Sequence, residues 1–147
     1  MRLSRRRLAP FIASMAFSGL CAISACLVYA VEIPLNLSGE TEVPKVESRA
    51  RGIGVITVGE DGAISGRITT SGLVGISAQL HDGTVDDRGP VVVSLEKSGE
   101  SWTIPQGTRL TSEQLASLRA GKLYINVHST THRDGEIRGQ LLYPGRP

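Results

Sequence analysis

Polar side chains that could bind a ligand recur at every second position in two adjacent segments near the C-terminus, residues 123–128 and 136–141. Alternate residues of a strand point to opposite faces, so the polar set of each segment shares one face and the apolar set shares the other. An antiparallel hairpin closed by residues 129–135 would place the two polar sets side by side. Together with a histidine on an earlier strand, the candidate binding residues are His81, Tyr124, Asn126, His128, Glu136 and Arg138.

The apolar sets fix the register of this hairpin, because a slip of one residue would turn them outward. The predicted pairs are His128 with Glu136, Asn126 with Arg138, and Tyr124 with Gln140. The residues predicted to be buried are Leu123, Ile125, Val127, Ile137 and Leu141. A polar row of this kind also occurs on any half-exposed sheet. Glu136 and Arg138 would then form a surface ion pair, and Arg138→Lys would cost little stability.

His81 and His128 raise the alternative of a metal-binding protein that holds copper or zinc. A tightly held metal needs three or four converging ligands, and no third close ligand accompanies these two histidines in the sequence. We therefore predict no metal and no cofactor, and expect His128 to order the turn that follows it, with Glu136 as its charged neighbour. No nucleotide-binding loop or nucleophile motif occurs in the sequence, so we predict no catalytic residues and no enzymatic activity.

Charge separates the first thirty residues from the rest of the 147-residue chain. They hold four of the 16 Lys and Arg residues and none of the 14 Asp and Glu residues. The remainder is slightly acidic, which argues against nucleic-acid binding because that requires clustered Lys and Arg. It is long enough for one domain with one core.

Residues 1–30 have the arginine-rich start and apolar run of an export signal, with cleavage predicted after Ala30. A second interpretation ends the signal at residue 25, because Ile23-Ser24-Ala25-Cys26 resembles a lipobox and would make Cys26 a lipidated first residue. A third leaves the segment uncleaved as an anchor. We expect an extracytoplasmic protein, which is secreted, periplasmic or envelope-anchored. Contact with a membrane is expected only through the signal or a lipid on Cys26.

Short β-strands dominate the domain expected over residues 31–147. Residues 53–58 and 63–70 are joined by a turn that contains Asp61-Gly62, which is a strong hairpin signal. Further strands are predicted at 76–81 and 91–95. Thr111 and Gln114 form a capping box at the start of the helix predicted over 111–120. The fold predicted is an all-β, Greek-key-like antiparallel sandwich of about eight strands with one short helix.

The two C-terminal segments closely resemble the closing signature of the CHRD domain, a family named after chordin. The matching blocks are 118–128 and 135–141, with further agreement at Leu37-Ser38-Gly39, Glu42-Val43-Pro44, Ala78 to His81 and Gly89-Pro90-Val91-Val92. Two positions depart from the family pattern: Gln79 stands in place of a histidine and Ser129 in place of a threonine. The resemblance implies an extracytoplasmic β-sandwich of the bacterial single-domain type. We predict a binding or structural module. The sequence does not identify its partner, for which an extracytoplasmic protein or an envelope component is the expected class.

A more distant similarity links the order of elements from Gly72-Leu73 to His81, and the strand that ends in His128, to the sandwich of copper-zinc superoxide dismutase. The chain lacks the bridging and zinc ligands of that enzyme. We therefore expect no dismutase activity.

Overall fold

The computed structural model of the protein describes residues 29–145. Cys26 and nearly all of the predicted export signal lie outside the described residues. Within 29–145 no helix is long and apolar enough to cross a membrane.

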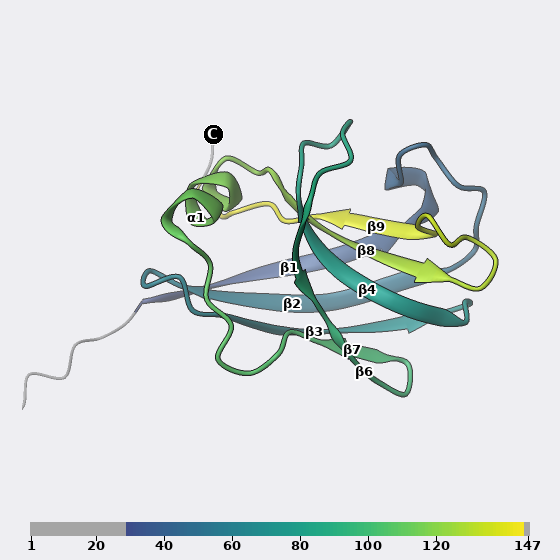
Figure 1. The fold of residues 1–147 in the computed structure, drawn as a ribbon, viewed down its shortest axis with the longest axis horizontal. Coiled ribbons are helices and arrows are strands. Elements are labelled where there is room, and N and C mark those ends of the chain that lie inside the picture. Colours follow the sequence, from purple (N-terminus) through teal and green to yellow (C-terminus); the bar gives the residue numbers. More distant parts are fainter. Residues whose placement is uncertain (1–28, 146–147) are drawn as a thin grey trace, which may run out of the picture.

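Nine strands form a single antiparallel sheet in the order β5-β4-β8-β9-β1-β2-β3-β7-β6 (Figure 1). The strands are β1 Ala30–Ser38, β2 Arg51–Gly59, β3 Ile64–Ser71, β4 Gly75–Asp82, β5 Val91–Ser94, β6 Glu96–Ser98, β7 Ser101–Thr103, β8 Leu123–Ser129 and β9 Ile137–Gln140. A short 3-10 helix, η1 (Gly39–Thr41), follows β1, and one α-helix, α1 (Ser112–Arg119), precedes β8. The all-β class with one short helix is therefore confirmed.

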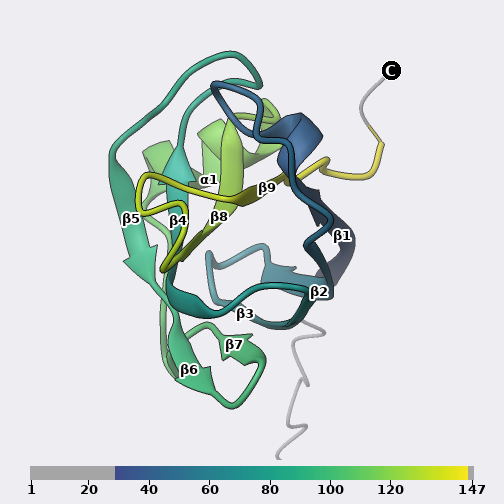
Figure 2. The same cartoon turned by 90° about the vertical axis from the view of Figure 1, so that its right-hand side faces the viewer.

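The sheet curls until its two edges nearly meet. The edge strands β5 and β6 are consecutive in the chain and are separated by Leu95 alone, whose N–H donates to the carbonyl of Ala78 at 2.9 Å. Figure 2 looks along the strands and shows β4 and β8 on the opposite side of the core from β2 and β3. The predicted sandwich is thus a nearly closed sheet, and the run predicted as one strand over 91–95 divides at Leu95.

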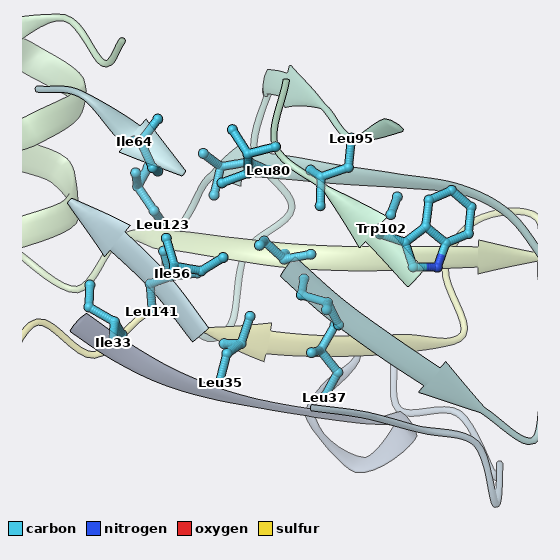
Figure 3. Packing of buried hydrophobic residues seen from close by; sticks show 14 of the residues in the cluster. Ile33, Leu35, Leu37, Ile56, Ile64, Leu80, Leu95, Trp102, Leu123 and Leu141 are labelled. Carbon is cyan, nitrogen blue, oxygen red and sulfur yellow. The ribbon is translucent and has the colours of Figure 1, made fainter. Parts of the chain in front are cut away.

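The core inside the curled sheet is almost entirely aliphatic. Strands from both sides contribute to it, including Leu35 of β1, Leu80 of β4 and Trp102 of β7 (Figure 3). Trp102 is 2 % exposed and its indole N–H donates to the hydroxyl of Thr70 at 3.3 Å. This buried apolar surface supplies the main driving force for folding.

Local sequence signals account for the turn and the helix that the chain forms. Gly62 has φ +82° in the β2–β3 turn, a conformation that suits glycine. At the start of α1, the Thr111 hydroxyl accepts from Gln114 N–H and the Gln114 side chain accepts from Thr111 N–H, as the sequence predicts. At its end the Lys122 N–H donates to Ser117, which closes a Schellman motif around a glycine.

The start of β4 departs from simple alternation of its two faces. Alternation along 76–81 places Ile76 inside with Ala78 and Leu80, but Ile76 is 47 % exposed. The β4–β8 register shifts between Gly75 and Ser77, and this β-bulge turns Ile76 outward.

Burial of the β8 apolar face leads to a prediction about paired substitutions. Val127 is fully buried, whereas Val55 on the outer face of β2 is 43 % exposed. We expect Val127→Asp to lower the free energy of unfolding by at least about 3 kcal/mol, since the carboxylate would be buried without a partner. Val55→Asp should lower the free energy of unfolding by less than about 1 kcal/mol, because the carboxylate would stay in contact with water. Urea denaturation measures both, and equal costs would contradict the assignment of the two faces.

Candidate functional site

The candidate site lies on the outer face of three neighbouring strands, β4, β8 and β9. In the β8–β9 ladder Tyr124 lies opposite Gln140 and Asn126 opposite Arg138, which confirms the predicted register. The ladder ends at Val127 and Ile137, before the third predicted pair, His128 with Glu136. The β4–β8 ladder adds His81, which lies opposite Tyr124. The five apolar residues predicted for the inner face are all fully buried: Leu123, Ile125, Val127, Ile137 and Leu141.

The outer polar face is also buried, contrary to its interpretation as a half-exposed surface. Asn126 is 5 % exposed and Arg138 is 1 % exposed. Two loops lie near this face, one over residues 39–50 and one over 83–90. Both are at the top of the molecule in Figures 1 and 2. Their contacts with the sheet come from segments far away in the sequence, so strand alternation carries no sign of them.

Arg138 ties the 83–90 loop to the sheet. One terminal nitrogen, Nη1, donates to the carbonyl of Asp87 at 2.9 Å, and the other, Nη2, donates to the carbonyl of Thr84 and to the side chain of Gln140 at 3.1 Å. The ion pair expected between Arg138 and Glu136 is not found. Arg138 takes part in no ion pair within the described part of the chain.

An aromatic stack continues from Arg138 across β8 to β4. The guanidinium carbon lies 3.5 Å from the ring centroid of Tyr124, and the His81 ring stacks on Tyr124 at 4.9 Å with an interplanar angle of 6°. The Gly89 backbone is hydrogen-bonded to both side chains. Its carbonyl lies 2.9 Å from His81 Nδ1, and its N–H donates to the Tyr124 hydroxyl. Burial lowers the pKa of His81. The hydrogen bond with the Gly89 carbonyl opposes this, and electrostatic interactions with His128 and Arg138 lower the pKa further.

Glu42 attaches the 39–50 loop to the same face, and sequence reasoning did not single it out as a site residue. Its carboxylate accepts from the Asn126 amide at 2.8 Å and from the N–H of Val43 at 2.9 Å. It is 2 % exposed, and burial raises its pKa. Arg88 joins the two loops directly by donating to the carbonyl of Val43.

His128 and Glu136 do not form the neighbouring pair that the sequence suggests. His128 Nδ1 lies 2.7 Å from the carbonyl of Arg133, so this side chain does hold the turn between β8 and β9. Glu136 instead accepts from the Ser48 hydroxyl at 2.6 Å and lies 3.5 Å from His132 Nδ1. The carboxylate therefore binds the turn and the 39–50 loop, because the side chain that faces it is His132.

The two histidines considered for metal binding occupy different parts of the face. His81 pairs with Tyr124, but His128 pairs with Ser77, four residues away along β4. That offset separates their backbone positions by about 13 Å along a strand, and a tightly held metal would need at least one further ligand beside these two. Nε2 of each ring is buried without a hydrogen-bond partner. No group of three His, Cys, Asp or Glu side chains between residues 29 and 145 is arranged to hold a metal ion.

A cavity of about 410 Å³ opens between the two loops above Arg138. Its lining combines buried charged groups, exposed charged groups and apolar side chains: Glu40, Thr41, Glu42, Val43, Pro44, Lys45, Val85, Asp86, Arg138 and Gln140. Of the six candidate binding residues, Arg138 alone lines this cavity. Three others contact the lining from outside the cavity: Tyr124 stacks on Arg138, His81 stacks on Tyr124, and Asn126 donates to Glu42. These contacts fix the lining in place, which suits it to binding.

A model of the CHRD domain matches residues 33–141 of the chain. This match confirms the family resemblance seen in the sequence. No curated protein and no solved structure matches the chain.

The contacts of Arg138 predict that lysine cannot replace it. A half-exposed polar face, as the sequence suggests, would tolerate the same substitution. Lysine lacks the planar fork that reaches two carbonyls and stacks on a ring. We expect Arg138→Lys to lower the free energy of unfolding by about 2–4 kcal/mol and to speed amide exchange in residues 83–90. Arg109→Lys is the control, because its pair with Asp61 is largely exposed and should be worth below about 1 kcal/mol. Similar losses in the two variants would contradict the role given to Arg138.

The lowered pKa of His81 predicts a stability that falls with acidity. In the unfolded chain the pKa of this ring is near 6.5, and in the folded state it is lower. Below about pH 6.5 the unfolded chain therefore binds the proton more readily, so the folded state loses stability relative to its stability above that pH. From about pH 7.5 to 5.5 the wild type should lose stability, and His81→Phe, which keeps a ring beside Tyr124, should lose less. Denaturation curves at both pH values measure the difference, and identical pH dependence would refute the expectation.

The bond from His128 predicts an effect that is independent of metal. We expect His128→Ala to lower the free energy of unfolding by about 1 kcal/mol, with and without a chelator, because a hydrogen bond to Arg133 is lost. Melting temperatures with and without the chelator test this. A chelator effect in the wild type that vanishes in both His81→Ala and His128→Ala would favour the metal-binding alternative.

Proposed function

The chain belongs to the CHRD domain family, and we propose that it acts outside the cytoplasm as a binding or structural module without catalytic activity of its own. Family membership supports the class of module. The arginine-rich and apolar first thirty residues support export, in a secreted, periplasmic or envelope-anchored form. The partner we propose is an extracytoplasmic protein or an envelope component, with no role for nucleic acid.

The observation that carries this proposal is the fixing of two exposed loops by buried polar side chains. Arg138 holds residues 83–90 through two backbone carbonyls, and Glu42 holds residues 39–50 through Asn126. A surface that is already ordered loses less conformational entropy on binding than a mobile one. Val85, which is 57 % exposed, lies at the edge of the cavity between the loops and is available to a partner.

Export itself is tested on the cellular product of the full chain. Intact mass distinguishes a chain that begins at Val31 from one that begins at a lipidated Cys26. Recovery of the uncleaved chain from the cytoplasm would reject the compartment that we propose.

Site-specific photo-crosslinking tests the binding surface. A photoreactive residue at Val85 should give a discrete adduct in cells, since this position lies beside the cavity. The matched control is Val74, which is 68 % exposed and precedes the other end of β4. Adducts of equal yield from both positions, or none from Val85, would contradict recognition by the two loops.

A further inference from the structure

Arg138 lines the cavity with a buried charge that has no opposite charge within ion-pairing distance in residues 29–145, although Glu42, Asp86 and Asp87 lie near enough to act on it electrostatically. Its side chain is 1 % exposed, and none of the ion pairs within residues 29–145 includes it. Burying a charge that is not paired destabilises the folded state, even when carbonyl groups solvate part of that charge. A bound anionic group would complete the pair.

The guanidinium keeps hydrogen-bonding capacity for such a group. It has five N–H donors, and three of them serve the carbonyls of Thr84 and Asp87 and the side chain of Gln140. Two donors remain. Gln140, which lies beside Arg138 in the lining, is itself fixed by donating to the carbonyls of Gly83 and Gly121 at 2.9 Å each. The floor of the cavity is therefore rigid before any ligand arrives.

The rest of the lining opposes a simple anion. Glu40, Glu42 and Asp86 bring carboxyl groups to the same cavity, and Lys45 is the further cation. A ligand with only a negative charge would meet these carboxyl groups, and a ligand with only a positive charge would meet Arg138 and Lys45. A molecule that carries both charges satisfies the two sets at once.

We propose that this cavity binds a small zwitterion, an amino acid or short peptide, whose carboxylate meets Arg138 and whose ammonium meets Glu40 and Asp86. Val43, Pro44 and Val85 provide apolar contact for its side chain. A volume of about 410 Å³ falls within the range of small-molecule sites. The inference deepens the proposed binding function, because the two loops that form the recognition surface also form the cavity.

Calorimetric titration of the protein purified from cells that express the full chain tests the ligand class. The probes are L-leucine and the dipeptide Ala-Leu, with N-acetyl-leucine and leucinamide as analogues that each lack one charge. We expect leucine or Ala-Leu to bind, and each analogue of the better-bound form to bind at least about tenfold more weakly, since one charged contact is lost. Preference for leucine identifies a free amino acid, and preference for Ala-Leu identifies a peptide.

Variants at the rim connect binding to the cavity. Asp86→Asn and Glu40→Gln alter exposed side chains and should each weaken zwitterion binding several-fold, whereas Glu60→Gln in the β2–β3 turn should leave it unchanged. No binding of either zwitterion at millimolar concentration would overturn the inference, as would equal binding of leucinamide or N-acetyl-leucine, or indifference to both rim variants. Crosslinking through Val85 that persists after such a result would reject the zwitterion alone, whereas loss of that crosslink would reject the binding surface.

Discussion

A guanidinium can leave water only if acceptors replace the water around it, and this requirement at Arg138 organises one whole side of the molecule. Strand β9 directs the side chain away from the aliphatic core, onto a face that would be wet in a simple sandwich. The carbonyls of Thr84 and Asp87 and the ring of Tyr124 surround it there. The 83–90 loop consequently adopts a fixed course across the sheet, and the cavity takes its shape from that course.

The two faces of the sheet are stabilised by different physics. The inner face depends on burial of aliphatic side chains from strands that curl until β5 and β6 approach each other. The outer face depends on hydrogen bonds that join residues far apart in sequence, such as Asn126 to Glu42. Apolar packing tolerates small shifts, whereas a buried polar group that loses its partner keeps the full cost of desolvation. We therefore expect the polar face to be sensitive even to conservative substitution.

Local patterns in the sequence predict the parts of this structure that depend on neighbours along the chain. The β8–β9 register, the Asp61-Gly62 turn and the Thr111 cap each follow from a few adjacent residues. The burial of Arg138 does not, because the loop that covers it begins more than forty residues earlier. Glu42 escapes notice for the same reason: only its contact with Asn126, across the fold, distinguishes it from an ordinary loop carboxylate.

The course of β1 has a geometric consequence for any form of the protein that remains attached to a membrane. The strand begins at Ala30, and η1 follows directly at its other end. Three residues lie between Cys26 and Ala30, so these two Cα atoms are at most about 14 Å apart, and a lipid at Cys26 would keep that end of the strand close to the bilayer. The nine residues of β1 then extend for about 30 Å toward the loops. The 39–50 loop, which helps to line the cavity, would then lie at the end of β1 that is opposite the lipid.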